Sequence, residues 1–520
     1  MQNFHTEAAW AYHDATKHSY QSIRAKPHYL DWDNQPLAFK IYSNLPAISL
    51  PQNLSSSGMP ALSAISTAAD VATSEVRVNL QTLAEILYFS AGITRQRKYA
   101  GGEMLFRAAA CTGALYHIDL YLVCGELDGL DAGVYHFSPQ DFSLRQLRQG
   151  DYQSALVEAS GEERAIAQAS CILVSASTFW RNAWKYQARA YRHCYWDNGT
   201  ILANLLAIAA ARDIPAKLVL GFIDATVSQL LALDPQREAP LSLVALGRWS
   251  KKKITLSPVI EPLVFETIPL SKSEIEYSDM RRMHEASSLQ SGEEVAAWRR
   301  RQYGNDKTTE DQGKSEARLF PLQSLSDQGL PKESIETVIT RRGSTREFSR
   351  ESITFVQLSS MLDRATRGVS TDLLGAEETL NDLYLIVNAV EGLPSGAYVF
   401  RRQRRALELL KPGDFRGDAG YLGLGQQIPA DCSVNIYFLA DLHRILERYG
   451  NRGYRAAQLE AAIIGGKIYL GAYAQRLGAS GLTFFDDDVT EFFSPDATGK
   501  SVMFLVAVGK SVKRKNPSAT

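Results

Sequence analysis

A repeat with a spacing of 263 residues constrains the fold of this chain more than any other feature of its sequence. The pattern Gly-Leu-x-x-Gly-x-Tyr-x-Phe begins at Gly129 and returns at Gly392. The β-rich run Asp-Leu-Tyr-Leu begins at Asp119 and returns at Asp382, with the same spacing. Self-similarity at a fixed spacing is the signature of a repeated structural unit. We therefore predict two copies of one domain in tandem.

Further pairs of segments in the same order keep this spacing to within one residue. These pairs are Lys185-Tyr186 with Arg448-Tyr449, Phe222 with Phe485, Asp224 with Asp487, and residues 244–248 with residues 506–510. Their unchanged order indicates that the repeat covers most of the chain and is not limited to one short motif.

The expected domain boundaries follow from where regular patterns begin and end. Residues 1–77 contain a Pro/Ser-rich run and are interpreted as an N-terminal arm that wraps the first domain. Apolar residues with helical spacing begin near residue 78, which places the first domain at residues 78–254. Residues 255–330 are too long for a simple linker and form a connecting segment. The second domain is then residues 331–520.

The two copies differ in two segments that carry candidate functional residues. Upstream of the strand-like runs the spacing is 275, so the second copy lacks about 12 residues that the first copy has. The missing residues correspond to the loop that contains Arg107 and residues 111–116. Conversely, the arginine-rich residues 341–346 map back to residues 66–71, where the first copy has no arginine. Each copy has therefore kept one special segment and lost the other.

Composition excludes several classes of function. Lysine and arginine number 56 against 57 acidic residues, so no net field attracts nucleic acid. The five cysteines form no CxxC pair, which favours reduced thiols and argues against a zinc site or a disulfide framework. The sequence has no apparent signal peptide and no run of 18 apolar residues. We expect a cytoplasmic protein without a metal site and without a nucleic-acid or membrane partner.

The arginine-rich segment is the strongest candidate for a ligand site. Arg341, Arg342 and Arg346 lie beside the hydroxyl of Ser344. Guanidinium groups pair with phosphate oxygens through two parallel hydrogen bonds, so this concentration of donors suits a phosphate dianion. Arginine in a last helical turn followed by Gly343 is also an ordinary helix end, and the local sequence leaves both interpretations open.

These residues also carry a resemblance to a known family. The pattern Arg341-Arg342-x-Ser344-x-Arg346-x-Phe348 resembles the FMN-phosphate motif of nitroreductase-fold domains. Residues 112–116, Lys185-Tyr186 and residues 12–19 are similar to the SagB-type branch of that family, whose FMN-dependent dehydrogenases oxidise peptide azolines to azoles. The resemblance implies an α+β fold, with a mixed, mostly antiparallel sheet flanked by helices. Because such subunits normally dimerise, it also implies an internal pseudo-dimer, and a further homo-oligomer stays open.

The same resemblance implies a cofactor, FMN, and residues that bind it. Its phosphate would be held by Arg341, Arg342, Ser344, Arg346 and Lys510, its ring by the backbone of Gly481 and Leu482, and its pocket lined by Arg107 and Thr112. Glycine permits the close backbone approach that a flavin ring requires. Simpler roles remain open at this point: a solvated terminal lysine, a plain turn and a structural loop.

The pair Lys185-Tyr186 is the candidate for proton chemistry. Azoline oxidation removes a hydride and a proton from adjacent carbons, and a buried lysine could take that proton. The second copy has Arg448 at the equivalent position, and arginine cannot act as a base at ordinary pH. A merely solvated lysine at a helix is the alternative.

The sequence therefore predicts an FMN-dependent oxidoreductase acting on a small molecule or a peptide. Two alternatives stay open: an NAD(P)H-dependent nitro- or quinone reductase, and a degenerate flavoprotein that serves as a binding or scaffold subunit. Neither copy alone carries both special segments, so a complete site requires the two halves to face each other.

Overall fold

A computed structural model gives the arrangement of the chain. It describes residues 2–25, 28–67, 75–99, 102–249, 256, 258–301, 318–375 and 378–512. Most of the first-copy counterpart of the arginine-rich segment, residues 68–71, lies outside these ranges, as does the predicted boundary at residues 254 and 255. We call residues 2–249 the first half and residues 256–512 the second half.

Each half contains a seven-stranded sheet, and the two sheets have the same strand order. The first sheet runs β1 (Ala47–Ser49), β6 (Ser143–Gln149), β5 (Gly133–Ser138), β4 (Ile118–Cys124), β7 (Cys171–Thr178), β9 (Glu238–Leu246) and β8 (Ala216–Val219). The second runs β10 (Leu319–Pro321), β15 (Ala406–Pro412), β14 (Gly396–Arg401), β12 (Asp382–Val387), β16 (Val434–Ala440), β18 (Ser501–Gly509) and β17 (Gly478–Gly481). All neighbours within both sheets are antiparallel. The predicted fold class, a duplicated and mostly antiparallel α+β arrangement, is confirmed.

Two smaller pairings complete the strands of the described chain. The hairpin of β2 (Ile93–Tyr99) and β3 (Gly102–Arg107) belongs to the segment that the second copy lacks. The short parallel pair of β11 (Ile353–Thr354) and β13 (Val390–Glu391) belongs to the second half.

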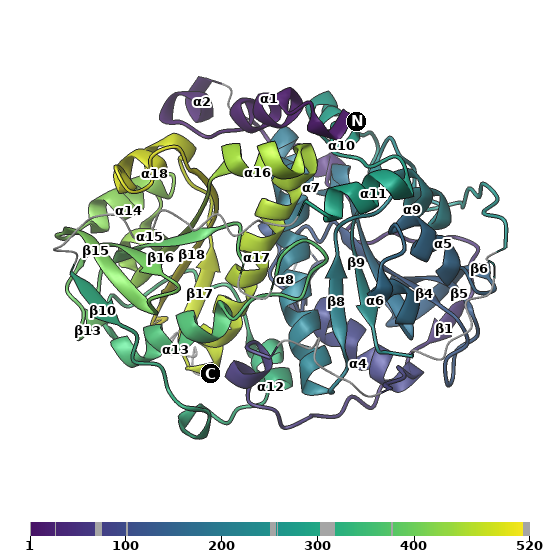
Figure 1. Ribbon diagram of the computed structural model, residues 1–520, viewed down its shortest axis with the longest axis horizontal. Helices are drawn as coiled ribbons and strands as arrows, with labels where there is room; N and C mark the ends of the chain where they lie inside the picture. Colours follow the sequence, from purple (N-terminus) through teal and green to yellow (C-terminus); the bar gives the residue numbers. More distant parts are fainter. Residues whose placement is uncertain are drawn as a thin grey trace.

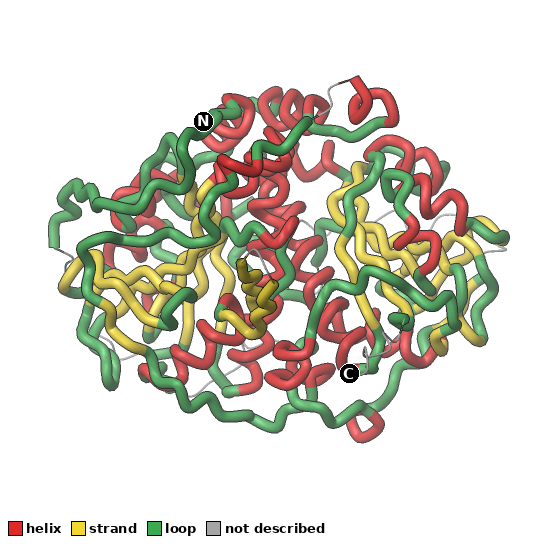
Figure 2. Tube along the Cα trace, turned by 180° about the vertical axis from the view of Figure 1, so that it is seen from behind, coloured by secondary structure: helices red, strands yellow, loops and turns green. Residues whose placement is uncertain are grey.

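Two long helices lie between the sheets and join the halves (Figures 1 and 2). These are α8 (Ala190–Ala211) and α17 (Asn451–Ala474). Every residue of α8 is buried, and so is nearly every residue of α17. A helix that is buried on all sides must be the core of a larger unit, so the contact between these helices is the centre of the molecule.

Small residues set the distance between the two central helices. A Cβ atom added to Gly199 would lie 2.5 Å from the Cβ of Ala462, and one added to Gly466 would lie 2.6 Å from the Cβ of Ala203. The spacing of 263 residues relates Gly199 to Ala462 and Ala203 to Gly466. The same glycine–alanine contact therefore occurs twice, once on each side of a pseudo-twofold axis.

Two equivalent ion-pair clusters also cross between the halves. They join Arg189 and Arg192 of the first half to Asp486 of the second, and Arg452 and Arg455 of the second half to Asp224 of the first. Each carboxylate is buried and receives two guanidinium groups from the start of the other half's central helix. A reciprocal exchange of this kind is what an isologous interface requires, so the halves form an internal pseudo-dimer.

One pairing expected from the repeat is wrong. The sequence comparison matches Asp224 with Asp487, but the structural equivalent is Asp486, which begins α18 (Asp486–Phe493) as Asp224 begins α9 (Asp224–Leu230). Asp487 is exposed and pairs with Lys17. The spacing changes from 263 to 262 in the turn before these helices, so three consecutive aspartates could not be aligned from sequence alone.

The N-terminal arm has its own counterpart in the second half. Helices α1 (Glu7–Ala15) and α10 (Ser278–Ala286) pack against each other near one end of the two central helices. The equivalent hydrogen bonds run from Arg192 to the His13 carbonyl and the Thr16 hydroxyl, and from Arg455 to the His284 carbonyl and the Ser287 hydroxyl. Residues assigned by sequence to the connecting segment thus occupy the place of a second arm. Their spacing of 271 concealed this part of the repeat.

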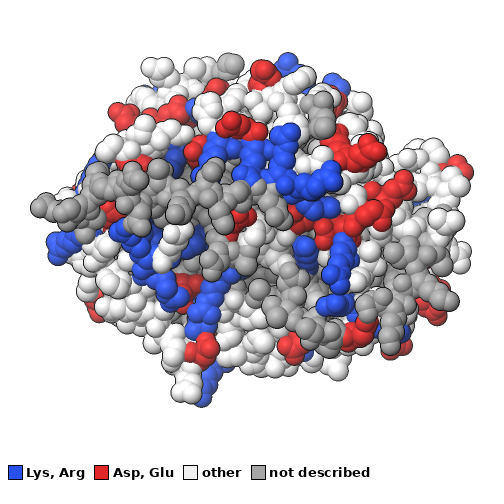
Figure 3. All heavy atoms as spheres, viewed as in Figure 1, with Lys and Arg blue, Asp and Glu red and all other residues white. Residues whose placement is uncertain are grey.

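Charge is mixed on the face shown in Figure 3. Basic side chains form separate groups, with acidic side chains between them. No helix in the described ranges is long and apolar enough to cross a membrane.

Candidate functional site

A cavity of about 400 Å³ lies where the two halves and the N-terminal arm meet. The first half contributes Thr112, Lys185, Tyr186, His193, Trp196 and Asp197, the second half Ser344, Arg346, Tyr469, Gly481, Leu482, Thr483 and Phe504, and the arm His18. A surface groove of about 610 Å³ over α9 contains none of the eleven candidate site residues. Seven of the eleven candidate residues therefore come together in one place, although they are up to 370 positions apart.

The remaining four candidates point elsewhere. Arg341 pairs with Glu333 and donates to the Tyr473 carbonyl. Lys510 lies 3.3 Å from Glu351 in a partly exposed pair. Neither group lines the cavity.

Arg107 and Arg342 form a buried connection behind the cavity. Arg342 donates to the carbonyls of Arg107 and Ala108 at 3.0–3.1 Å, which ties the second half to the first. Arg107 donates to the Ala38 carbonyl at 2.6 Å, and burial lowers the pKa of its guanidinium to about 10. Both guanidinium groups are directed at backbone oxygens of the protein.

Two cations near Ser344 have no carboxylate partner in the described part of the chain. Arg346 is exposed, lines the cavity and forms no ion pair or hydrogen bond with any described residue. Arg95, on the β2–β3 hairpin, places its guanidinium nitrogens 3.9 and 4.0 Å from the position of a Cβ atom at Gly343, and no described carboxylate pairs with it. Arg95 was not predicted, because nothing in its local sequence shows that a first-half hairpin reaches the arginine-rich segment.

Asp197 fixes the loop that only the first copy has. Its carboxylate accepts from the Thr112 amide at 2.9 Å, the Thr112 hydroxyl at 2.8 Å, the Cys111 thiol at 3.0 Å and the His117 ring at 2.9 Å. Burial, with the Asp197 carboxylate next, raises the pKa of Cys111, so its thiol keeps its proton. The loop is thus held as one cavity wall by a single buried acid on α8.

Glycine at position 113 is required by the close approach of Tyr186. Gly113 has φ 66°, and a Cβ atom there would lie 2.8 Å from the Tyr186 hydroxyl oxygen. Tyr186 ends α7 (Phe179–Tyr186), and its ring stands edge-on to His193 at 4.7 Å. Burial and then Asp197 raise the pKa of Tyr186, so the phenol stays protonated and can donate a hydrogen bond.

Lys185 and His193 lie at the same wall of the cavity. Lys185 is half-buried, its Nζ lies 5.5 Å from the Tyr186 ring centre, and no described residue pairs with it. His193 Nδ1 lies 2.7 Å from the Asn182 amide oxygen, which can only accept, so Nδ1 carries the proton and Nε2 is an acceptor. Burial and then Arg189 lower the pKa of His193 well below its usual range, which keeps the ring neutral.

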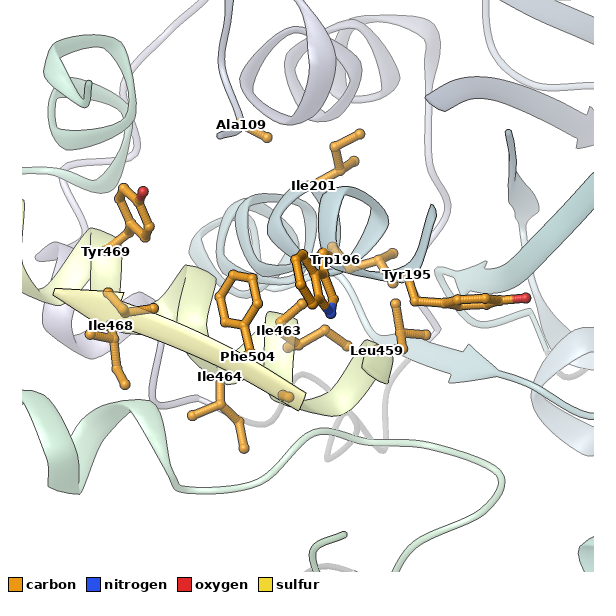
Figure 4. Packing of buried hydrophobic residues seen from close by; sticks show 14 of the residues in the cluster. Ala109, Tyr195, Trp196, Ile201, Leu459, Ile463, Ile464, Ile468, Tyr469 and Phe504 are labelled. Carbon is orange, nitrogen blue, oxygen red and sulfur yellow. The ribbon is translucent and has the colours of Figure 1, made fainter. Parts of the chain in front are cut away.

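The opposite wall combines backbone and aromatic groups. The Gly481 amide donates to the Tyr469 hydroxyl, and the Thr483 amide has no acceptor among the described residues. Trp196 on α8 and Phe504 on β18 face each other with ring centres 5.4 Å apart (Figure 4). The cavity thus joins an apolar aromatic floor, an unpaired amide and unpaired cations, which is the composition of a cofactor site.

The position that the pseudo-twofold axis relates to this cavity is filled by side chains. A residual space of about 10 Å³ is lined by Ala456, Leu459, Glu460 and Ile463, which the spacing of 263 relates to His193, Trp196, Asp197 and Thr200. The segment that replaces the missing loop fills the space with Val369, Leu373, Leu374 and Leu380. Asp372 in that segment accepts from the amides of Leu220 and Gly221 at 2.8 and 3.0 Å. Of the two related places, one is a cavity of about 400 Å³ with polar and aromatic lining, and the other is nearly filled by mainly apolar side chains.

Comparison with known proteins defines the class to which the second half belongs. The sequence model of the nitroreductase family matches residues 339–510. The chain therefore contains a nitroreductase-family domain, and this domain carries the arginine-rich segment. Within the described ranges, no group of three or more His, Cys, Asp or Glu side chains is placed to hold a metal ion.

Individual relatives agree with this class. A crystal structure from Anabaena variabilis, of a protein provisionally described as a nitroreductase, covers 97% of this chain and 99% of its own at 25% identity and a TM-score of 0.77. A Methanocaldococcus jannaschii protein with the same provisional description is 25% identical over 171 residues, which are 33% of this chain and 81% of the relative. The trifolitoxin-processing protein TfxB of Rhizobium leguminosarum bv. trifolii is 28% identical over 175 residues, 31% of this chain and 44% of the relative.

Proposed function

We propose that the chain is an FMN-dependent oxidoreductase of the SagB type that takes one FMN in the cavity between its halves. The observation that carries this proposal is the meeting of the two special segments. Each copy kept only one of them, and both line the single open member of a pair of related places. Were the chain only a scaffold, nothing would favour keeping the two segments in register at one cavity.

The residues of the cavity fit an FMN molecule. A phosphate dianion needs charge-assisted donors, and Arg346 and the Ser344 hydroxyl line the cavity, while Arg95 lies beside the neighbouring Gly343. Neither arginine has a carboxylate partner in the described chain. Ring carbonyls and ring nitrogens need backbone donors, which the Thr483 amide supplies. The cavity volume of about 400 Å³ lies within the range of cofactor and ligand sites.

The proposed reaction assigns roles to Lys185 and Tyr186. When bound, FMN supplies a two-electron hydride acceptor. An azoline that becomes an azole loses a hydride from one ring carbon and a proton from its neighbour, and the two electrons pass finally to molecular oxygen. Lys185 takes the proton on Nζ and releases it to solvent, and the protonated Tyr186 holds the substrate by a hydrogen bond. The likeness to a trifolitoxin-processing protein supports a peptide substrate.

The test is reconstitution followed by oxidation of a model azoline. The purified chain is incubated with FMN and with a thiazoline-4-carboxamide peptide in air, and loss of two hydrogens is followed by mass spectrometry. We expect a thiazole product from the wild type and at least about a 100-fold slower reaction from Lys185→Arg, the residue of the other copy, with unchanged FMN binding.

Other outcomes would select the alternatives. Anaerobic bleaching by NADPH followed by reoxidation by menadione, with no thiazole formed, would favour a nitro- or quinone reductase. Two relatives carry the description nitroreductase. A colourless chain that cannot be reconstituted with FMN would favour a binding or scaffold subunit and overturn the proposal.

A further inference from the structure

The two halves of the chain form a natural comparison for the arm residue His18. Its amide donates to the Asp486 carboxylate at 2.8 Å, and in the other half the Leu289 amide donates to Asp224 at 3.2 Å. Each aspartate is held by two arginines of the partner half. His18 and Leu289 are therefore equivalent positions in the same supporting structure.

The amide hydrogen bonds at the two positions are the same in both halves, but the side chains at these positions differ. His18 lines the open cavity, whereas Leu289 is completely buried in the half whose related place is filled. Because the same hydrogen bonds form around leucine, the imidazole is not needed to position the arm. What distinguishes the two positions is that His18 lines a cavity and Leu289 does not line the cavities described above.

The geometry of the His18 ring leaves one nitrogen available to a ligand. Nδ1 lies 3.3 Å from the Thr483 hydroxyl, and no described residue bonds to Nε2. Burial and then Arg189 lower the pKa of His18 to about 3, with Arg192 acting in the same direction and the Asp486 carboxylate opposing it. The ring is therefore neutral at physiological pH and has no charge to offer a phosphate. It suits a neutral polar group such as an amide or a ketone.

We propose that His18 contacts the substrate, the molecule that exchanges hydride with the flavin, through Nε2, and that the N-terminal arm thereby sets which substrates bind. The expected partner is a neutral carbonyl or amide group. This inference rests on the proposed function, because it presumes that FMN occupies the remainder of the cavity.

The chain itself suggests the test variants. His18→Leu places at this position the residue that the equivalent arm carries, so the fold should tolerate it. His18→Gln keeps a hydrogen-bonding side chain. His5→Leu is the matched control, because His5 is exposed on the same arm and makes only backbone contacts in the described structure.

Three quantities separate the possible roles. FMN affinity is measured by quenching of flavin fluorescence. Binding of a thiazoline-4-carboxamide is measured by its perturbation of the flavin absorbance. Access of a neutral ketone is measured by the kinetics with which menadione reoxidises the reduced enzyme. We expect His18→Leu to weaken amide binding and lower kcat/KM for menadione by about fivefold to tenfold, the cost of one neutral hydrogen bond. In His18→Leu, FMN affinity and kcat for menadione should stay within about twofold of the wild type. His18→Gln should recover part of the loss in amide binding and in kcat/KM, and His5→Leu should match the wild type.

Each contrary result overturns a defined statement. Unchanged amide binding and menadione kinetics in a folded His18→Leu variant overturn the role of His18 alone. A large loss of FMN affinity in that variant would show that His18 contacts the cofactor, and would also overturn the proposed contact between His18 and the substrate. A wild-type chain that binds no FMN overturns the proposed function and this inference together.

Discussion

The contact between the two central helices gives a quantitative prediction about the pseudo-dimer. Gly466→Ala would place a methyl group 2.6 Å from the Cβ of Ala203 and 3.2 Å from the Cα of Thr200, where carbon atoms normally approach to about 3.5–4.0 Å. Both neighbours are short and belong to a rigid helix, so the helices must move apart by about 1 Å. Overpacking of this kind costs about 1–3 kcal/mol, and the better helix propensity of alanine offsets about 1 kcal/mol. We expect a net loss of up to about 2 kcal/mol in the free energy of unfolding.

The assay is urea denaturation followed by circular dichroism, with Gly417→Ala as the matched control. Gly417 is an exposed residue of helix α14 (Arg416–Leu422), and a Cβ atom there would meet nothing within 4 Å. The control variant should therefore be stabilised by up to about 1 kcal/mol through propensity alone. Because Thr200 lines the cavity, Gly466→Ala should also weaken FMN binding. Equal stabilisation of the two variants would refute the close helix contact and the reasoning built on it.

Two further predictions concern charged groups. Arg346→Ala should weaken FMN binding by about 10-fold to 100-fold, the contribution of a charge-assisted hydrogen bond. Arg341→Ala should change FMN binding by less than about twofold, because the Arg341 guanidinium is paired with Glu333. Equal losses of affinity in a fluorescence titration would contradict this assignment. Burial opposes ionisation of Asp224, but the arginines of the other half outweigh it and lower its pKa to about 2. A lowered pKa gives stability that is present above the unfolded value near 4 and is lost as pH falls through about 2, so the urea midpoint should fall in that window, and less steeply in Asp224→Asn. The same slope in both proteins would show that this ion pair does not control acid stability.

Much of the fold could be predicted because the two copies within the sequence can be aligned with each other. The runs at Asp119 and Asp382 became equivalent strands of sheets with one strand order, and the fold class followed. The second arm was missed because its spacing of 271 differs from the main repeat and only a few residues, such as His13 and His284, are identical.

The residue types of the site could be predicted from the sequence, but the directions in which their side chains point could be predicted less well. Arginine signals anion binding, yet the side chains of Arg107 and Arg342 donate to backbone carbonyls. Those carbonyls lie 69 and 235 residues away in the sequence, so the direction of each side chain depends on distant contacts. Arg95 and Asp197 carry no local motif, and His18 lies in a stretch, residues 12–19, whose resemblance to the family assigned it no role in the site. Their roles emerge only where the two halves meet, and sequence spacing does not encode that contact.

The number of FMN molecules per chain tests the central claim most directly. Titration of the purified, flavin-depleted chain with FMN, followed by absorbance of the retained flavin after gel filtration, gives this number. The open cavity and its filled counterpart predict one FMN per chain. Two would show that the leucine-filled place opens to a ligand, and none would show that the cavity between the halves is not a flavin site.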